Sequence, residues 1–214
     1  MERRAKRRRV AKTPAARRED LLDAGLAVFR EKGVRAATVE DVTMRAGVAK
    51  GTFYLYFKTK EELGAALRER FALEMLQTAE EMLAGLEADD WEARAEALVR
   101  SVVTFSLERR ELAELVFHGL PPAGDGDLVI ASERKVLALF RDTAARGAAA
   151  GRFDVRDPET TAALLFHGLH GVMMDLAHQP DDADAERLVA AAAELLRRGL
   201  GARGAAGSSV SDYD

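Results

Sequence analysis

Apolar residues recur at helical spacing along most of this chain. The first such stretch follows Thr13 and Pro14, a capping residue and a residue that suits the first helical turn. One face of the predicted helix carries Leu21, Leu22, Gly25, Leu26 and Phe29. Gly33 is placed to end this helix, because glycine readily adopts the left-handed conformation that follows helix C-termini.

Two short helices are predicted next. Thr38 followed by Asp41 is an acidic variant of the capping box, a pair whose side chains bond to the free backbone N–H groups of a helix start. Gly47 stops this helix after about two turns. A second short helix is predicted over residues 49–57.

The rest of the chain keeps the same periodicity. Thr59 and Glu62 repeat the capping-box pattern, and the helix that they open continues to about Leu86. Further helices are predicted over 91–108, 110–119, 127–149, 157–178 and 184–200. No segment alternates polar and apolar residues with a β-branched bias, so the pattern predicts an all-α fold of about nine helices.

One helical stretch, Thr161 to Met174, contains no Asp, Glu, Lys or Arg. A helix that is apolar on all sides must be buried on all sides. Gly168 and Gly171 would allow close approach of another helix. We therefore expect helices 157–178 and 184–200 to form half of a four-helix bundle in a homodimer, with a monomeric bundle core as the alternative.

Charge is distributed unevenly along the chain. Residues 1–60 hold 16 Lys and Arg against 7 Asp and Glu, a net charge of +9, whereas the remainder holds 16 against 29, a net charge of −13. Seven basic residues fall within 1–12, and we expect this arm to be disordered because like charges repel. A basic end suggests a polyanionic partner, although a basic tail on a helical protein that needs solubility would look the same.

Composition excludes several classes of function. There is no cysteine, which excludes disulfides, thiol catalysis and thiolate metal sites. The apolar runs fall short of the roughly 18 residues of a membrane span, and no apolar segment follows the basic start, so we expect a cytoplasmic protein without membrane contact. The motifs of phosphate loops, dinucleotide sites and serine hydrolases are missing. We therefore expect no enzyme, no catalytic residue and no cofactor.

Residues 38–63 are the candidate functional motif. Two short helices joined by a tight turn at Gly47 have the geometry of a helix-turn-helix. On the second helix Lys50 and Tyr54 share one face, and Phe53 and Phe57 would point to the core. Gly51 and Thr52 lie near its N-terminus, where base-edge contacts are usually made. Hydroxyl and amine groups of the same stretch can donate to phosphate, and they belong to Tyr54, Tyr56, Lys58 and Lys60.

These residues resemble the signature of the TetR family of bacterial transcriptional regulators. The resemblance is carried by Thr38, Ala46-Gly47-Val48, Lys50-Gly51-Thr52-Phe53-Tyr54, Tyr56-Phe57 and Lys58-Thr59-Lys60-Glu61-Glu62-Leu63. The preceding helix also fits, and strong resemblance covers about residues 15–65. Beyond that stretch the likeness is one of architecture.

The resemblance implies a dimer in which each subunit has a three-helix DNA-binding domain and a helical ligand-binding domain. By position, contacts to phosphate are implied for Thr38, Tyr54, Tyr56, Lys58 and Lys60. Contacts to base edges are implied for Lys50, Gly51 and Thr52. Glu40 departs from the pattern, because a neutral or basic residue would suit a surface that faces DNA. The alternative role for Glu40 is to complement the positive end of the helix N-terminus. The basic arm would either enter a minor groove or raise non-specific affinity.

The second domain offers less specific candidates. Residues that would line an effector cavity, or equally belong to the core, are Phe105, Phe117, His118, Phe140, Phe166, His170, Met173 and Met174. His167 and His170 are three residues apart, a spacing that suits a metal, but no third ligand is evident unless His118 lies near, so we expect no metal site. The acids after Pro180 lack the glycine of a calcium loop and are interpreted as a helix start.

The sequence therefore predicts four regions: a disordered basic arm 1–12, a DNA-binding domain 13–60, a ligand-binding and dimerisation domain 61–203, and a disordered tail 204–214. We expect a repressor that binds a pseudo-palindromic operator as a dimer and is released by a small, mostly apolar effector. The alternatives are a sequence-indifferent architectural DNA-binding protein and a small-molecule-binding protein with an idle DNA domain.

Overall fold

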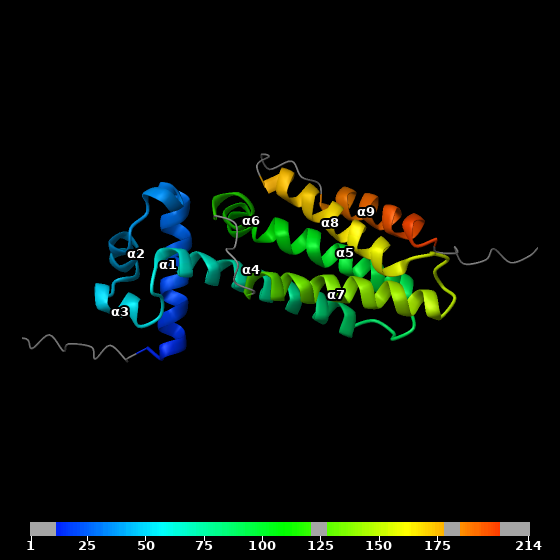
Figure 1. Ribbon diagram of the computed structural model, residues 1–214, viewed down its shortest axis with the longest axis horizontal. Helices are drawn as coiled ribbons and strands as arrows, with labels where there is room; N and C mark the ends of the chain where they lie inside the picture. Colours follow the sequence, from blue (N-terminus) through cyan, green and yellow to red (C-terminus); the bar gives the residue numbers. More distant parts are fainter. Residues whose placement is uncertain (1–11, 121–127, 178–184, 202–214) are drawn as a thin grey trace, which may run out of the picture. The chain divides into compact units, whose positions relative to one another are not determined.

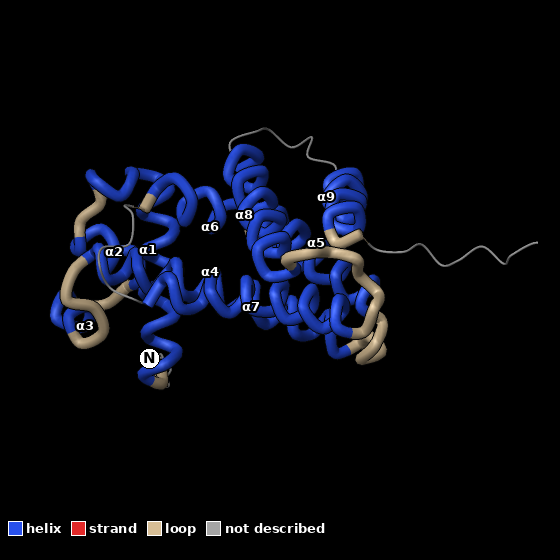
Figure 2. The backbone as a smooth tube through the Cα atoms, turned by 45° about the vertical axis from the view of Figure 1, so that its right-hand side comes forward, coloured by secondary structure: helices blue, strands red, loops and turns tan. Residues whose placement is uncertain are grey.

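The computed structural model describes residues 12–120, 128–177 and 185–201, and all regular structure within these ranges is helical (Figures 1 and 2). The predicted all-α fold is therefore confirmed. The predicted arm 1–12, apart from Lys12, and the predicted tail 204–214 lie outside the described residues. No helix in the described ranges is long and apolar enough to cross a membrane.

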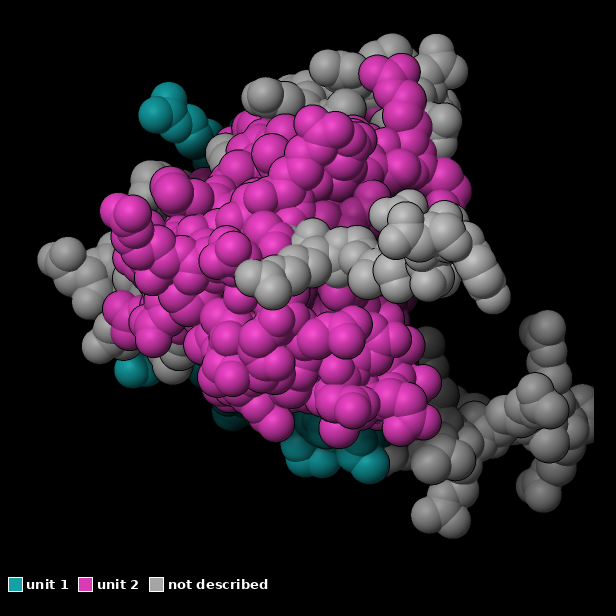
Figure 3. Space-filling view, turned by 90° about the vertical axis from the view of Figure 1, so that its right-hand side faces the viewer, with its two compact units in different colours: residues 1–67 teal, residues 68–214 magenta. Residues whose placement is uncertain are grey.

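The chain divides into two compact units, Met1–Leu67 and Arg68–Asp214, which Figure 3 distinguishes by colour. Unit 1 contains α1 (Pro14–Ala36), α2 (Val39–Ala46), α3 (Lys50–Tyr54) and the start of α4 (Lys60–Ala84). Unit 2 contains the rest of α4, α5 (Trp91–Glu108), α6 (Arg110–Glu114), α7 (Leu128–Ala149), α8 (Pro158–Ala177) and α9 (Ala185–Gly199). The predicted boundary after residue 60 remains a prediction.

Unit 1 is built around a core that joins all of its helices. Its fully buried side chains include Leu21 and Leu22 of α1, Val42 of α2, Phe53 of α3 and Leu63 of α4. Gly25 explains how α1 and α4 come so close, because a Cβ at this position would lie 2.5 Å from Cδ2 of Leu63. This packing holds the short helices α2 and α3 in place.

Unit 2 is a helical bundle in which α5 contacts α7, α8 and α9. Its buried side chains include Val103 of α5 and Val136 of α7, both fully buried. The rings of Phe140 and Phe166 join α7 to α8 with centroids 5.4 Å apart. Two separate hydrophobic cores are the physical reason that the chain divides into two units.

Two predicted helix boundaries were wrong, and a third predicted helix has the expected bounds but changes its type. Gly33 has the expected positive φ of 74°, but the helical segment resumes and α1 ends at Ala36. The helix predicted over 49–57 is shorter, because α3 covers only Lys50–Tyr54. The helix predicted over 110–119 changes after Glu114 into a π-helical turn, Leu115–Gly119, in which Leu120 N–H donates to Leu115 O. Helix ends depend on local hydrogen bonding that periodicity does not report.

Candidate nucleic-acid interface and ligand cavity

The turn between α2 and α3 has the geometry of a helix-turn-helix. Thr38 and Asp41 form the predicted capping box, in which each side chain accepts from the other's backbone N–H. Gly47 is in the left-handed conformation, with φ 64° and ψ 38°, and Val48 N–H donates to Thr43 O. Because a residue with a Cβ is strained there, Gly47 sets the angle at which α3 leaves α2.

Helix α3 buries one face and exposes the other. Phe53 and Phe57 are buried, as predicted, and their rings lie 5.7 Å apart. Lys50, Gly51 and Tyr54 are exposed. An added Cβ at Gly51 would meet no atom within 4 Å, so the backbone is open to a partner at this position. The residues predicted to reach base edges thus lie together at the N-terminal end of an exposed helix, with Thr52 half-buried beside them.

The start of α4 differs in detail from the predicted second capping box. Thr59 Oγ1 accepts from Glu62 N–H, as expected of a capping residue. The Glu62 carboxylate, however, accepts from the backbone N–H of Lys58 and not from that of Thr59. The side chain of Lys58 is exposed, and its amine has no partner among the described residues. Lys58 is therefore available to an anion from solution.

Lys60 is not available in the same way. Its Nζ donates to the carbonyl oxygens of Val34, Arg35 and Ala37 at distances of 2.8, 2.9 and 2.9 Å. The ammonium thus satisfies carbonyl groups at the end of α1, where a positive charge also complements the helix dipole. A phosphate contact by Lys60 would have to replace one of these bonds, since the three donors of its ammonium are already used within the protein, and the contact remains a prediction.

Thr38 is also engaged within the protein. Its hydroxyl donates to Asp41 Oδ2 at 2.8 Å and accepts from Asp41 N–H at 3.2 Å. A hydroxyl has a single proton to donate, so a phosphate contact by Thr38 would have to replace the bond to Asp41. No such constraint applies to the two tyrosines, since neither hydroxyl has a hydrogen-bond partner among the described residues; Tyr54 is exposed and Tyr56 is half-buried.

Glu40, the residue that departs from the expected pattern, forms an ion pair with Lys50. The pair joins the start of α2 to the start of α3, and both side chains are more than half exposed, at 57% and 53%. The hydrogen bond from Lys50 lowers the pKa of the Glu40 carboxyl, and the same bond raises the pKa of the Lys50 amine. Both groups are therefore charged at neutral pH.

Unit 2 contains a small interior cavity of about 10 Å³. Three of the predicted ligand residues line it together: Phe166, His170 and Met173 of α8. Their partners from α4 and α5 were not predicted from the sequence, and they are Phe71, Met75, Val102 and Ser106. The volume is that of about one water molecule, so a larger ligand would have to displace side chains.

The other predicted ligand residues lie away from this cavity or outside the described residues. Phe105 is buried against Phe71, with ring centroids 5.1 Å apart, and does not line the cavity. His118 is exposed. The side chains of Phe117 and Met174 are outside the described part of the chain. Among the described residues, no group of three or more His, Asp or Glu side chains is arranged to hold a metal ion.

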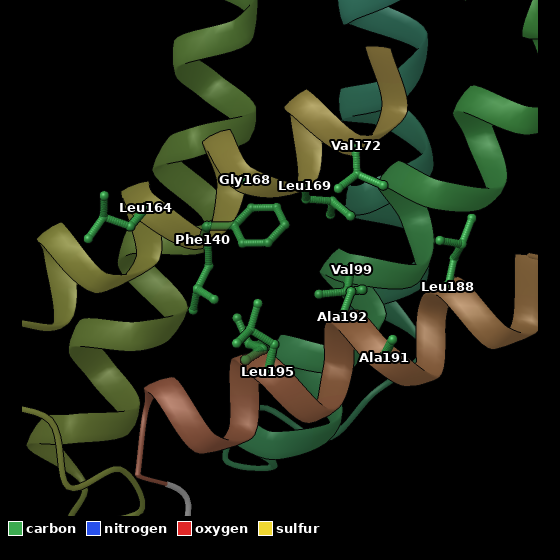
Figure 4. A pocket seen from close by; sticks show the side chains of 12 residues that line it. Val99, Phe140, Leu164, Gly168, Leu169, Val172, Leu188, Ala191, Ala192 and Leu195 are labelled. Atoms are coloured by element: carbon green, nitrogen blue, oxygen red, sulfur yellow. The ribbon is translucent and has the colours of Figure 1, made fainter. Parts of the chain in front are cut away.

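A larger apolar groove, of about 520 Å³, lies between α8 and α9 (Figure 4). Phe140, the remaining ligand candidate, lines this groove together with Val99 of α5. Leu164 of α8 and Leu195 of α9 border it and are 70% and 61% exposed. Exposed leucines around an apolar groove are typical of a surface that another protein covers.

Comparison with known proteins matches residues 21–67 to the model of a family described as "Bacterial regulatory proteins, tetR family". The uncharacterized HTH-type transcriptional regulator YvdT of Bacillus subtilis is 31% identical over 109 residues, which cover 51% of this chain and 55% of YvdT. The HTH-type transcriptional repressor KstR2 of Mycobacterium tuberculosis is 44% identical over 55 residues, 26% of this chain and 28% of KstR2. The chain thus spans about half the length of YvdT, and less of KstR2.

A solved structure, the fatty acid degradation regulator FadR from Bacillus halodurans, shares the fold over both units of the chain. Its TM-score is 0.76 at 24% identity, with 91% of this chain and all of that chain covered. The helix-turn-helix around Gly47 lies within the segment that matches the family model. The segment 21–67, which contains the helix-turn-helix, thus matches the TetR family of bacterial regulatory proteins, and both units of the chain resemble FadR in fold.

Proposed function

We propose that this protein is a transcriptional repressor that binds operator DNA as a dimer and releases it when an apolar effector binds unit 2. The observation that carries the proposal is the exposed N-terminal end of α3, with Lys50, Gly51 and Tyr54 held on a helix whose other face is buried. Such a helix fits the major groove. The net charge of +9 over residues 1–60 would attract the phosphates.

The residues of α3 and those that follow it have separate roles in this proposal. Lys50, beside Gly51 and Thr52, would read base edges, since a lysine amine pairs with the O6 and N7 acceptors of guanine. Lys58, Tyr54 and Tyr56 would hold phosphates and so fix the position of the protein along the DNA. Two subunits would place their α3 helices in successive major grooves, about 34–36 Å apart.

The effector would enter at the small cavity between α4, α5 and α8. Its walls are apolar, with Phe71, Met75 and Phe166 among them, whereas Ser106 and His170 offer polar groups. A ligand with an apolar body and few polar atoms suits such a lining. Helix α4 contributes both cavity residues and, through Lys60, contacts to the end of α1, so it would couple effector to DNA binding.

The test of the DNA-binding role is the salt dependence of binding to a labelled duplex. We expect Lys58→Ala to weaken binding to every sequence alike and to lower the slope of log affinity against log salt by about one. Lys135→Ala is the control, because Lys135 is an exposed lysine of α7 in unit 2. Equal slopes for wild type and Lys58→Ala would exclude the phosphate contact.

A further inference from the structure

An acidic side chain on a surface that binds DNA has a cost, because it repels the phosphates. Glu40 nevertheless lies at the start of α2, next to Lys50 on α3. The capping box of α2 is formed by Thr38 and Asp41, while the Glu40 carboxylate lies in the first turn and interacts there with its own backbone N–H. Its only contact in the described residues that joins two helices is the ion pair with Lys50.

We infer that Glu40 is a positioning residue that holds the Lys50 amine away from phosphates and thereby raises the selectivity of the protein for its operator. This inference rests on the proposed function. The lysine ammonium is a point charge on a flexible side chain, and it binds any nearby anion. Without a local partner, Lys50 would bind the phosphates of any sequence and add affinity that carries no sequence information.

The ion pair changes the competition for the Lys50 amine. Both side chains are largely exposed, so the pair is weak enough for a well-placed acceptor to replace it. In the operator, guanine O6 and N7 offer such an acceptor at a fixed place in the groove. On unrelated DNA Lys50 stays with Glu40 and neutralises no phosphate, and the carboxylate adds repulsion.

The experiment compares wild type with Glu40→Gln on a random-sequence duplex at several salt concentrations. With the carboxylate gone, Lys50 gains one phosphate contact, and the slope of log affinity against log salt should steepen by about 0.9. The affinity of the variant should then fall roughly 3.5-fold more than that of wild type between about 50 and 200 mM salt. On a duplex selected for tight binding, the ratio of selected to random affinity should fall.

Two further variants separate positioning from simple charge removal. In a Lys50→Ala background, Glu40→Gln should leave the slope unchanged, because no amine is released. Glu31→Gln is the matched control: it removes a carboxylate that pairs with Arg45 at 2.6 Å, between α1 and α2, without involving α3. We expect Glu31→Gln to leave the ratio of selected to random affinity unchanged.

The inference would be overturned if Glu40→Gln, with its helical circular dichroism intact, kept the wild-type slope on random DNA. It would also be overturned if the slope steepened equally in the Lys50→Ala background. The repressor proposal itself would fail on a different result, namely that wild type binds selected and random duplexes with the same affinity. The slope on random DNA decides the role of Glu40 in either case.

Discussion

Lys58 and Lys60 are two residues apart at the start of α4, yet their amines have different surroundings. The Lys58 amine is exposed and has no partner among the described residues. The Lys60 amine donates to three carbonyl oxygens at the end of α1, the nearest being Val34 O at 2.8 Å. The same type of side chain is thus open to a ligand from solution at Lys58 and bonds within unit 1 at Lys60.

Lys60→Ala should lower the free energy of unfolding, because it leaves carbonyl groups at the end of α1 without their donor. Hydrogen bonds to a charged group contribute about 1.5–3 kcal/mol, and partial exposure reduces this, so we expect a loss of about 1–2 kcal/mol in urea denaturation. The salt slope of DNA binding should stay as in wild type. Lys58→Ala should show the opposite pattern, and a lowered slope for Lys60→Ala would support its predicted phosphate contact.

Sequence periodicity was enough to place Phe53 and Phe57 in the core and Tyr54 on the surface. The hydrogen bonds of Lys60 could not be predicted from periodicity. The carbonyl groups that accept from its amine belong to residues 34–37, which come near Lys60 only in the folded unit. The Glu40–Lys50 pair was missed for the same reason. Helical spacing reports neighbours within one helix, and these contacts join two.

At the scale of the element, α2 depends on the carboxylate of Asp41. The bond from Lys32, 2.5 Å from Asp41 Oδ1, and the bonds from Thr38 lower the pKa of this carboxyl from 3.8 to about 2. A lowered pKa means that the folded state favours the charged form. The stabilisation is therefore complete above pH 3.8 and is lost as the pH falls towards about 2.

This dependence predicts a pH-dependent effect of Asp41→Asn. At neutral pH the variant should be less stable than wild type, because its amide cannot pair with the Lys32 ammonium. The difference should shrink as the pH falls from 3.8 to about 2, where the wild-type carboxyl takes up its proton. Urea midpoints measured at a series of pH values would show this, and a difference that stayed constant would contradict it.

The interior cavity could be predicted only in part from the sequence. Phe166, His170 and Met173 of α8 were among the residues predicted to line a cavity or the core. Its walls from α4 and α5 could not be found, because each of those helices simply has an apolar face, and which residues meet depends on how the helices cross. Phe140 was placed with the cavity but lines the groove between α8 and α9 instead.

The assignment of the effector site to the cavity predicts different effects for two neighbouring valines of α5. Val102 lines the cavity and Val99 lines the groove, and both are buried. We expect Val102→Phe to abolish binding of the uncharged apolar dye N-phenylnaphthylamine, measured by fluorescence, and Val99→Phe to retain it. Thermal unfolding checks that the two overpacked variants remain equally folded. The reverse pattern would place the effector in the groove.

At the scale of the whole molecule, the groove between α8 and α9 bears on assembly. The sequence predicted these helices as a dimer interface, and that remains a prediction. Leu164 and Leu195 beside the groove are exposed in the single chain. In a homodimer a second copy would cover them, because an interface core is apolar and depleted of charge.

We therefore expect Leu164→Glu and Leu195→Glu to give monomers in light scattering, with helical content unchanged because both side chains are exposed. Leu73→Glu is the control, since Leu73 is a 43% exposed leucine on α4 that lines neither the groove nor the cavity. The monomers should also bind DNA more weakly, because they would lose one of two half-sites. Dimers that persist in both variants would exclude this interface.

The two units also differ in charge, which the sequence alone revealed. The positive charge is concentrated in residues 1–60, nearly all of unit 1, and the remainder is negative. One unit would thus attract DNA while the other does not. Charge and the exposed face of α3 together favour specific DNA binding by unit 1.

The most direct test of that claim is to mix the protein with sheared genomic DNA of its source at about 150 mM salt, a concentration at which non-specific binding is weak, and to sequence what it retains. We expect a few enriched sites that share an inverted repeat, with the two halves spaced for a dimer. Uniform recovery of the genome, or recovery of no DNA with and without apolar compounds present, would contradict it.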